Sequence, residues 1–231
     1  MKIDLHCHSE ASHDSSTPLA LIPDRCRQQK IRVQAITDHN QVWGAQKLQQ
    51  MVEDEGCTDL TIIVGEEVSS TEGEIVGLFL TEKIEAGLTP EETVKRIKGQ
   101  GGLVLIPHGF DPMKRWRLRP QALERITEGV DIVETFNARI SQLRWNQAAV
   151  SWCKEHQVLM SAGSDAHTLA DIGSAWVEAP LRNIDVPGDL LKALNGGTPM
   201  GVWTHPVLAY LYKMIDRTRR RLSAGLGLGG N

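Results

Sequence analysis

Two histidines near the start of the chain have the spacing of a metal chelate. The run Asp4-Leu5-His6-Cys7-His8 reads as a short β-strand. Because side chains on a strand alternate between its two faces, His6 and His8 point to one side and Cys7 points to the other. Two neutral imidazoles side by side are typical ligands of a transition metal. The segment therefore predicts part of a metal site, and its other ligands must come from elsewhere in the chain.

Further candidate ligands follow apolar runs that read as buried strands. These runs are residues 33–36 before Asp38 and His39, 60–64 before Glu66 and Glu67, 103–106 before His108, 132–136 before Asn137 and including Glu134, and 158–160 before Asp165 and His167. In a β/α barrel the carboxyl ends of the parallel strands meet on one face. Such a fold would bring ligands from distant parts of the sequence to a single site.

The rest of the pattern fits that fold, since the apolar runs alternate with helical segments. Helices are predicted over residues 18–29, 43–55, 90–99, 120–128, 141–156 and 187–194. Strands that alternate with helices imply a parallel sheet. Residues 74–80 form an additional β-rich run, which we expect as an extra strand beside the barrel. We predict an α/β barrel domain over residues 1–203, followed by a separate segment over 204–231.

Composition describes a soluble globular protein. The chain has 231 residues, 41% of them hydrophobic and 23% charged, with a formal net charge of −4. No signal-peptide pattern is visible and no apolar run is long enough for a transmembrane segment. Four cysteines are scattered without a Cys-x-x-Cys pair, so a reducing compartment is expected. We therefore expect a cytoplasmic protein.

The segment 204–231 has a different character from the barrel. It holds five basic residues and one acidic residue, and it ends in a glycine-rich tail. Its apolar residues recur at helical spacing: Val207, Leu208, Leu211, Met214 and Ile215. We predict an amphipathic, basic C-terminal helix that docks on the barrel or mediates self-association. The alternative is a helix that lies on a membrane surface or a nucleic acid.

Five motifs together resemble the PHP (polymerase and histidinol phosphatase) family of metal-dependent phosphoesterases. They are Asp4-Leu5-His6-Cys7-His8-Ser9, Thr37-Asp38-His39-Asn40, Gly65-Glu66-Glu67, Pro107-His108 and Gly163-Ser164-Asp165-Ala166-His167. The resemblance covers roughly residues 1–180. It implies a distorted (β/α)7 TIM-like barrel of the PHP type. It also implies two or three divalent metal ions, namely Zn, Mn or Fe, with Mg as a further candidate.

The same resemblance implies a first metal site and a bridge to a second. The residues that match the first-site ligands are His6, His8, Glu67 and Asp165. Glu67 matches the carboxylate that bridges to the second metal, and its Gly-x-Glu spacing favours it over Glu66. His108 matches another ligand of the second metal. The last ligand of that metal would fall at Glu134 or Asn137, where this chain has no histidine, so the second site could also be weak.

A third metal position is implied by residues from three further places in the chain. His39 and His167 match two of its ligands. The third ligand comes from the loop after the first strand, where we favour Asp14 over His13. Asp38 is expected to orient a ligand histidine rather than to bind metal itself. This third position completes a predicted set of eight metal ligands.

Basic residues near these strand ends predict a phosphate site. Lys114 and Arg115 follow His108 in a loop, and Arg139 follows the strand that ends at Asn137. A guanidinium fork matches the oxygens of a phosphate. We predict Arg139, Lys114 and Arg115 as substrate-binding residues. The predicted catalytic set is Glu67, His39, Asp165 and Arg139.

The predicted function is the hydrolysis of small phosphomonoesters, nucleotides or nucleoside bisphosphates among them, by metal-activated water. The rival prediction is an exonuclease or phosphodiesterase that acts on short oligonucleotides, which the basic loop and tail would suit equally well. A non-catalytic, metal-bound regulatory module is the third reading. The full set of candidate ligands argues against it.

Overall fold

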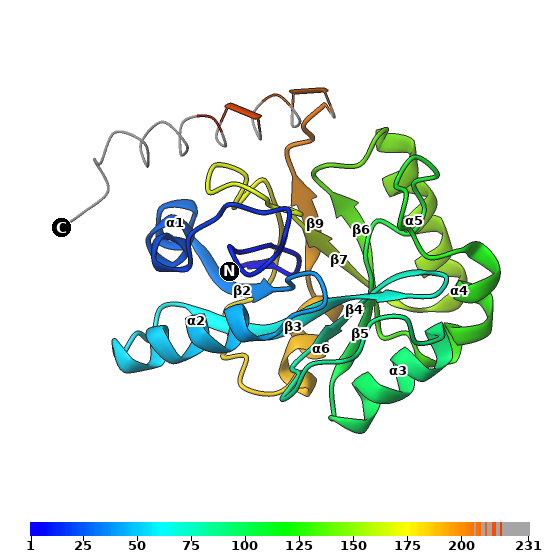
Figure 1. The fold of residues 1–231 in the computed structure, drawn as a ribbon, viewed down its shortest axis with the longest axis horizontal. Coiled ribbons are helices and arrows are strands. Elements are labelled where there is room, and N and C mark those ends of the chain that lie inside the picture. The colour runs from blue at the N-terminus through cyan, green and yellow to red at the C-terminus, as the bar shows by residue number, and fades with distance from the viewer. Residues whose placement is uncertain (206, 209–210, 212–213, 216–217, 219–231) are drawn as a thin grey trace.

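The fold is a nearly closed α/β barrel (Figure 1). The computed structural model describes residues 1–205, 207, 208, 211, 214, 215 and 218. Its strands form one sheet in the order β7-β6-β5-β4-β3-β2-β1-β8-β9. Their bounds are β1 Lys2–Asp4, β2 Ile31–Ile36, β3 Thr61–Ser70, β4 Gly73–Leu78, β5 Leu103–Ile106, β6 Ile132–Asn137, β7 Leu159–Gly163, β8 Ala175–Glu178 and β9 Thr198–Gly201.

Hydrogen bonds beyond the ends of β1 and β7 close the barrel. The backbone N–H of Leu5 donates to the carbonyl of Ala162 over 3.2 Å, and that of His8 donates to Ala166 over 2.9 Å. In return, the N–H of Asp165 donates to the carbonyl of His6 over 2.8 Å. The segment that carries the first two histidines is therefore paired with the segment that carries Asp165. This pairing fixes their spacing through the backbone.

Strand β4 differs from the sequence prediction. It was expected as an extra strand beside the barrel, but it lies within the wall, between β3 and β5 and antiparallel to both. A tight hairpin joins β3 to β4, with Ser70 opposite Gly73. Because β4 runs in the reverse direction, its first residues lie at the same edge as the last residues of the parallel strands. The strict alternation of strand and helix is broken at this point.

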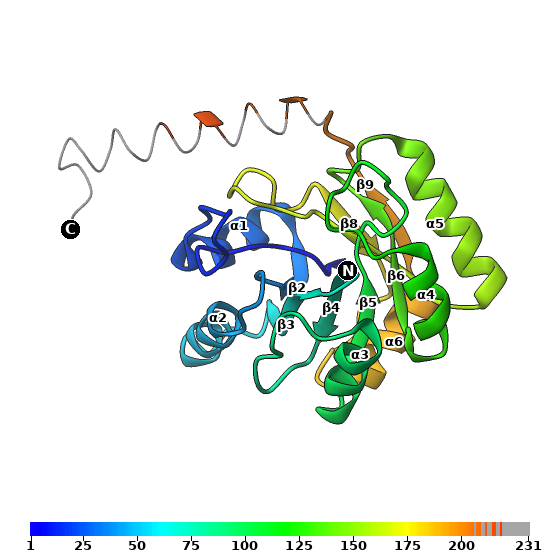
Figure 2. The same ribbon diagram turned by 45° about the vertical axis from the view of Figure 1, so that its right-hand side comes forward.

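The helices up to residue 156 cover the outside of the barrel, whereas the helix over residues 187–195 packs its buried side chains with those on the inner faces of the strands (Figure 2). Their bounds are α1 Ile22–Gln29, α2 Trp43–Asp54, α3 Pro90–Gly99, α4 Pro120–Ile126, α5 Leu143–His156 and α6 Pro187–Asn195, with short 3₁₀ turns at Leu19–Leu21 and Thr127–Gly129. Helix α3 begins as its sequence predicts. The hydroxyl of Thr89 accepts from the N–H of Glu92 over 3.2 Å, and Pro90 occupies the first turn.

The core has two apolar layers, which follow from the alternation of side chains along the strands. Ile63, Leu103 and Leu105 belong to the layer inside the barrel. Their neighbours Val64 and Val104 belong to the layer between the sheet and the helices. Apolar side chains fill the inside of the barrel, and polar side chains gather at the end of the barrel where the parallel strands finish, which we call its upper end.

The segment after the barrel is only partly described. Its apolar residues Val207, Leu208, Leu211, Met214 and Ile215 are helical and exposed, so they do not pack on the barrel. The basic residues Arg217 and 219–221 and the glycine-rich tail lie outside the described residues. The separation of the chain at residues 203 and 204 stays a prediction. No helix in the described part of the chain is long and apolar enough to cross a membrane.

Gly73 allows the loop of residues 111–119 to lie on the β3–β4 hairpin. Its φ is +130°, and a Cβ there would overlap the backbone of Arg117 and Leu118. Two hydrogen bonds hold the loop in this position. The N–H of Glu74 donates to the carbonyl of Trp116 over 2.8 Å, and the N–H of Arg119 donates to that of Glu72 over 2.9 Å.

We expect Gly73→Ala to destabilise the protein by more than Gly87→Ala does. Gly87 also has a positive φ, +82°, but a Cβ there meets no atom within 4 Å. Gly87→Ala should therefore cost only the backbone term, about 1–2 kcal/mol. Gly73→Ala should cost that and the displacement of the loop. Denaturant unfolding of both variants measures the two free energies, and equal losses would show that the loop does not need this close approach.

Candidate metal centre

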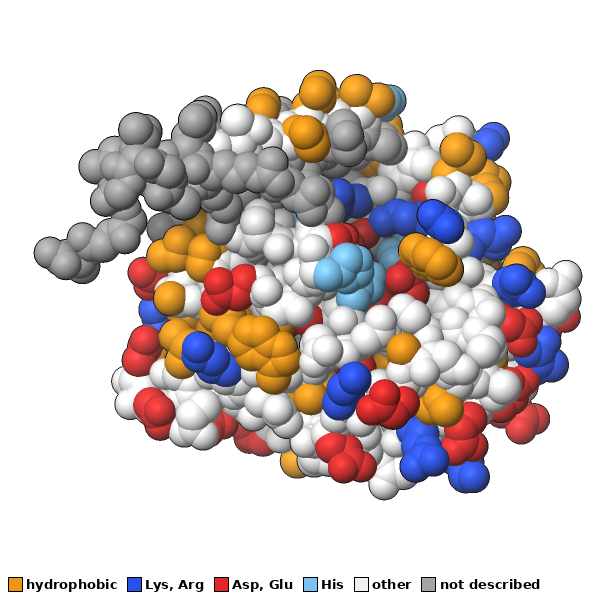
Figure 3. Space-filling view, viewed as in Figure 1, with side chains coloured by type: hydrophobic (Ala, Val, Ile, Leu, Met, Phe, Trp, Pro, Cys, Tyr) orange, Lys and Arg blue, Asp and Glu red, His pale blue; other side chains and the backbone are white. Residues whose placement is uncertain are grey.

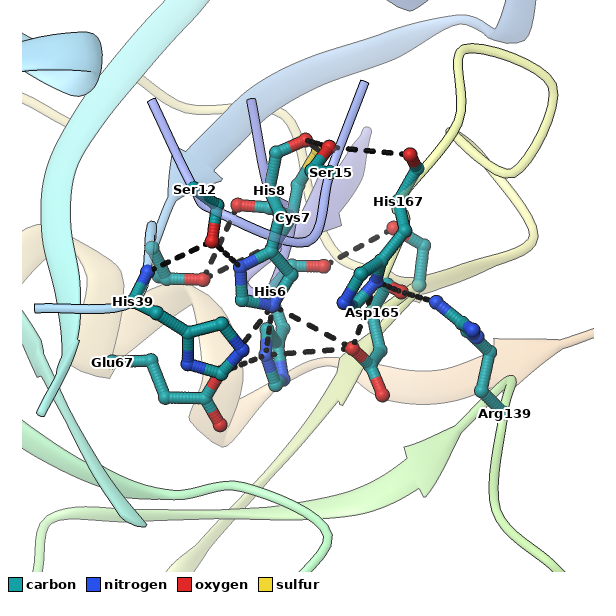
Figure 4. Close-up of polar contacts among 12 residues, drawn as sticks. His6, Cys7, His8, Ser12, Ser15, His39, Glu67, Arg139, Asp165 and His167 are labelled. Atoms are coloured by element: carbon teal, nitrogen blue, oxygen red, sulfur yellow. Dashed lines mark hydrogen bonds and ion pairs between the residues drawn. The ribbon is translucent and has the colours of Figure 1, made fainter. Parts of the chain in front are cut away.

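The predicted ligands lie together where the parallel strands of the barrel end, and Figure 4 shows His6, His8, His39, Glu67, Asp165 and His167 among them. They come from five strands or from the residues just beyond those strands. His6 and His8 follow β1, His39 follows β2, Glu67 lies in β3, His108 follows β5, and Asp165 and His167 follow β7. All of these side chains except His39 are buried. Because the carboxyl ends of the parallel strands of a barrel meet on one face, residues 6 and 167 come together although they are far apart in the sequence.

A first cluster has three ligand atoms at close mutual distances and a fourth candidate, Asp165, beside them. The Nε2 atoms of His6 and His8 lie 3.1 Å apart, and each lies 3.3 Å from Oε2 of Glu67. Oδ1 of Asp165 lies 3.8 Å from Nε2 of His6 and 3.6 Å from Nε2 of His8. The atoms of His6, His8 and Glu67 form one compact group, and Asp165 lies beside its two imidazoles.

These distances fit a tetrahedral metal ion. With ligands at about 2.0–2.1 Å from zinc, ligand atoms in a tetrahedron are about 3.3–3.4 Å apart. The separations among His6, His8 and Glu67, 3.1–3.3 Å, are close to that value, and Asp165 lies slightly further from the two imidazoles, at 3.6–3.8 Å. The donor set of two imidazoles and two carboxylates suits Zn, Mn or Fe. The first cluster is therefore a candidate site for a divalent cation.

A second cluster forms around the same Glu67 carboxylate. Its Oε1 lies 3.1 Å from Nε2 of His108, and its Oε2 lies 3.4 Å from Nδ1 of His39. Glu74 completes this group, with Oε1 3.5 Å from Nδ1 of His39 and Oε2 3.8 Å from Nε2 of His108. Glu67 thus faces two groups of ligand atoms, which is the geometry that a bridging carboxylate requires.

Glu74 is a candidate ligand that sequence reasoning missed. It lies in β4, and the predicted barrel had no place for the start of that strand. Its signal was an acidic residue at the first buried position of an apolar strand, where a charge needs a partner. The geometry favours Glu74 over Glu134 or Asn137 as the remaining ligand of the second group.

Glu134 and Asn137 instead surround the ligands. Oε1 of Glu134 lies 3.2 Å from Nδ1 of His6. Its Oε2 accepts from the backbone N–H of His108 over 2.7 Å and from the side-chain amide of Asn137 over 2.9 Å. A carboxylate on the second nitrogen of a ligand histidine fixes the orientation of the ring. Both carboxylate oxygens of Glu134 therefore hold His6, His108 and Asn137 in position.

A third cluster lies beside the first. Oδ2 of Asp14 lies 2.7 Å from Nε2 of His167, and its Oδ1 lies 3.8 Å from Nε2 of His39. His8 also belongs to this group, and its ring centre is 4.4 Å from that of His167. His13 is exposed, with its ring centre 5.4 Å from that of His39. The geometry favours Asp14 over His13 as the acidic ligand.

Asp38 has a different role from the one expected. Its Oδ1 accepts from the backbone N–H of Ser9, and its Oδ2 accepts from the Ser9 hydroxyl, both over 2.6 Å. It therefore anchors the turn that follows His8 and does not hydrogen-bond to a ligand histidine. The ring of His8 is held instead by Ser12, whose hydroxyl lies 3.4 Å from Nδ1.

The electrostatics of the cluster show how much negative charge is buried here. Although burial alone would raise the pKa of the Glu67 carboxyl, the imidazoles of His6, His39 and His108 hold it well below its usual range. Burial and the carboxylates of Glu67 and Asp165 raise the pKa of Glu74 to about 10. Glu74 is therefore protonated near neutral pH when no cation is bound. A bound divalent cation would lower the pKa of Glu74 and favour its ionised form.

Two basic side chains approach Asp165 from the open side. Nζ of Lys114 lies 2.6 Å from Oδ2 of Asp165, and Nη1 of Arg139 donates to the Asp165 carbonyl over 3.1 Å. Together with Arg115 and the exposed Trp116 they line a pocket of about 180 Å³ above the ligands. This pocket is a small, cation-lined space against a buried cluster of metal-ligand types.

Asp111 joins the two loops that carry these basic residues. It is fully buried, and its Oδ2 accepts from the backbone N–H of Ser141 over 2.7 Å. Its Oδ1 accepts from the Ser141 hydroxyl over 2.7 Å and from the N–H of Met113 over 2.9 Å. The loop after β5 and the loop after β6 are therefore tied together beneath the pocket. Sequence reasoning did not identify Asp111, because its partner lies 30 residues away.

Comparison with known proteins supports the resemblance seen in the motifs. The family model of the PHP domain matches residues 4–158, and a model of a PHP-associated region matches residues 144–199. An uncharacterized protein of Methanocaldococcus jannaschii is 36% identical over 194 residues, which are 82% of this chain and 75% of that protein.

Solved structures share the fold at low sequence identity. A two-domain protein of Bacteroides vulgatus that contains a predicted PHP-like metal-dependent phosphoesterase aligns with a TM-score of 0.66 at 16% identity, over 92% of this chain and 69% of that chain. Endonuclease Q, in complex with a 27-mer duplex that has an abasic lesion at the active site, aligns with a TM-score of 0.62 at 14% identity. That match covers 85% of this chain and 57% of the endonuclease chain.

Replacing Glu67 should remove more than one equivalent of metal. Because Glu67 faces two groups of ligand atoms, we expect Glu67→Gln to lose both and almost all activity. Glu66→Gln is the matched control, because Glu66 points away from the cluster and its Oε2 accepts from the N–H of Ile84 over 2.8 Å. Elemental analysis of both variants after metal loading measures the stoichiometry. The opposite ranking would show that Glu66 is the ligand.

Glu66 also predicts a dependence of stability on pH. Burial raises the pKa of Glu66 from 4.5 to about 7. The folded state therefore binds this proton more tightly than the unfolded state does, and the wild type loses stability as pH rises from 4.5 to 7. Glu66→Gln cannot make this transition. Its free energy of unfolding relative to wild type should be higher at pH 8 than at pH 4.5, by up to about 3 kcal/mol. Denaturant unfolding at the two pH values would contradict this if the difference is constant.

Proposed function

Because this chain belongs to the PHP domain family of metal-dependent phosphoesterases, we propose that it hydrolyses small phosphomonoesters. The observation that supports this most is the first cluster, in which His6, His8 and Glu67 present ligand atoms 3.1–3.3 Å apart. We propose that this cluster holds one divalent metal, with Asp165 as the fourth ligand. Zn, Mn and Fe are the candidates, with Mg as a further one.

We propose two additional cation positions in the same centre. Glu67 would bridge from the first cluster to the group that it forms with Glu74, His39 and His108. Asp14, His39 and His167 would hold a third ion. Bound divalent metals supply polarisation of a phosphoryl oxygen and a lowered pKa for a water molecule.

The protein's own side chains would place the phosphate. The ammonium of Lys114 and the guanidinium of Arg139 both lie on the open side of Asp165, where a phosphate above the ligands would present its oxygens. Asp111 holds together the two loops that carry Lys114 and Arg139, so these two basic side chains approach the phosphate from fixed positions. The pocket of about 180 Å³ leaves little room around the reacting group, which favours a terminal phosphate over an ester in the middle of a chain.

A second candidate function is cleavage of short oligonucleotides from an end. The loop after β5 favours it, since Lys114, Arg115, Arg117 and Arg119 lie within six residues of one another. Endonuclease Q, which has the same fold, is a DNA-acting enzyme by its name and complex. Cleavage of an oligonucleotide that has no terminal phosphate would favour this function. A non-catalytic regulatory module would bind metal and cleave neither substrate class.

A phosphate-release assay tests the proposal directly. We expect metal-loaded protein to release phosphate from at least one small monoester in the presence of Mn²⁺ or Zn²⁺, and to lose this activity on chelation. The panel should include nucleoside monophosphates, sugar phosphates and short oligonucleotides with and without a terminal phosphate. Protein that carries metal yet releases no phosphate and cleaves no strand would refute the enzymatic proposal.

Arg139→Ala separates phosphate binding from metal binding. Arg139 is half-buried at the pocket. Its guanidinium donates to the backbone carbonyl of Asp165 and not to the Asp165 carboxylate, so metal content should be unchanged. The loss of one charged hydrogen-bond partner should lower kcat/KM by roughly ten- to a hundredfold, about 1.5–3 kcal/mol. Arg139→Lys should recover part of this, because an ammonium cannot replace the fork. Arg144→Ala, an exposed arginine stacked on Trp145, is the control and should change neither quantity.

A further inference from the structure

We propose that Trp203 is a positioning residue for the phosphate site. Its indole N–H holds the turn that carries Arg139, so the segment that leaves the barrel after β9 helps to set the affinity for phosphate. This inference rests on the proposed function, because it takes Arg139 to contact a phosphate at the metal centre. It extends the phosphate site to a part of the chain beyond the last strand.

The chain beyond β9 stays on the barrel for a few residues before the exposed helical residues begin. The N–H of Val202 donates to the carbonyl of Ser174 over 2.7 Å. Gly201 lies directly on the ring of Phe136 in β6, where a Cβ would overlap that ring. Figure 1 shows the chain leaving β9 beside the end of β6. Residues 202–204, which we call the strap, therefore reach the turn that follows β6.

Two hydrogen bonds join the strap to the turn that carries Arg139. Nε1 of Trp203 donates to the carbonyl of Ile140 over 2.7 Å. The backbone N–H of Thr204 donates to the carbonyl of Ala138 over 3.0 Å. These two carbonyl groups belong to the residues on either side of Arg139. The strap therefore restrains the backbone immediately before and after the arginine.

The backbone of this turn closes only weakly on itself. Its internal hydrogen bond, from the N–H of Ile140 to the carbonyl of Asn137, is 3.4 Å long. The bond from Trp203, at 2.7 Å, lies at the short end of the usual range for N–H donors. Trp203 and Ile140 are 63 residues apart in the sequence. The stronger restraint on the turn therefore exists only when the segment after β9 has folded onto the barrel.

The position of the turn decides where the guanidinium of Arg139 lies. The N–H of Arg139 donates to Oδ1 of Asn137 over 2.8 Å, and its Nη1 donates to the carbonyl of Asp165 over 3.1 Å. Figure 4 shows the side chain directed toward Asp165, and Figure 3 shows basic side chains beside the histidines at the centre of this face. A displacement of about 1 Å can weaken a positioned contact by a large factor. A shift of the turn would therefore cost phosphate affinity.

The turn is also held from a second side, by Asp111. Its Oδ2 accepts from the N–H of Ser141, which joins the turn to the loop of Lys114. The strap joins the same turn to β9. Loss of the Trp203 bond would therefore leave the turn folded but less fixed, so we expect weaker phosphate binding without loss of metal.

Trp145 provides a matched control for Trp203. It follows the same turn, in α5, and its Nε1 is buried with no hydrogen-bond acceptor among the described residues. Trp145→Phe removes the same N–H group as Trp203→Phe but breaks no hydrogen bond. A difference between the two variants therefore reports the bond to Ile140, and not the general effect of replacing an indole.

Binding of inorganic phosphate tests this inference without turnover. Titration calorimetry on zinc-loaded, full-length protein gives the Kd of phosphate, and elemental analysis gives the metal content of each variant. We expect Trp203→Phe to raise this Kd roughly three- to tenfold, the contribution of a neutral hydrogen bond, and to keep the metal content. Trp145→Phe should leave both quantities unchanged. An unchanged Kd in Trp203→Phe would overturn the inference.

A double-variant cycle shows whether the effect passes through Arg139. Arg139→Ala should raise the Kd of phosphate by roughly tenfold or more, because a charge-assisted hydrogen bond is lost. Adding Trp203→Phe to Arg139→Ala should change the Kd no further, since no guanidinium is left to misplace. If Trp203→Phe raises the Kd by the same factor in both backgrounds, Trp203 acts on something other than Arg139 and the assignment fails.

Thr204→Pro is an independent variant of the strap. Proline has no N–H, so the bond to the Ala138 carbonyl is lost while Trp203 is retained. We expect this variant to raise the Kd in the same Arg139-dependent way. If Thr204→Pro raises the Kd and Trp203→Phe does not, the strap acts through Ala138 alone and Trp203 has no positioning role.

The failures of the two proposals are distinguishable. Hydrolysis of monoesters together with a phosphate Kd that Trp203→Phe leaves unchanged would overturn the role of Trp203 and keep the proposed function. An Arg139-dependent loss of phosphate affinity in Trp203→Phe, in protein that hydrolyses no ester, would support the role of Trp203 and overturn the enzymatic proposal. An unchanged Kd in Arg139→Ala would overturn the inference by removing the contact on which it depends.

Discussion

The buried carboxylate of Glu67 is the interaction on which the rest of the site depends. Its two oxygens lie within 3.1–3.4 Å of nitrogens from four histidines, which come from three different strand ends. Isolated, such a group would be costly to bury. Here the histidines hold it ionised, while burial and the neighbouring carboxylates raise the pKa of Glu74 to about 10, so that Glu74 is protonated when no cation is bound. The barrel must be rigid at this end, because the partners of Glu67 are carried by three separate strands.

Much of this arrangement could be predicted from the sequence, because strand ends in a parallel barrel share one edge. His6, His39 and Asp165 each follow an apolar run, and that rule brought them together without any structural information. The α/β barrel of the PHP type is confirmed by the fold and by its family. The rule could not predict Glu74, because it assumes that all strands are parallel. Strand β4 is antiparallel, so its first residues, and not its last, lie at the ligand edge.

Roles that depend on long-range hydrogen bonds were also beyond the sequence. Asp38 precedes His39 directly, which favoured a role in orienting a histidine, but its carboxylate is taken up by Ser9. Glu134 matched a ligand position, yet both of its oxygens are occupied by His6, Asn137 and the backbone of His108. In each case the residue type was informative, and the partner that decides its function lies in another loop.

The two-residue turn between β3 and β4 sets the register of the strand that carries Glu74. Side chains on β4 alternate between the ligand edge and the helix layer, so the register of this hairpin decides that Glu74, and not Ile75, faces Glu67. One residue inserted into Thr71-Glu72 that shifts β4 by one position would place Gly73 where Glu74 now stands and turn Glu74 to the other face of the sheet. The length of a surface turn therefore decides whether this strand supplies an acid to the ligand cluster.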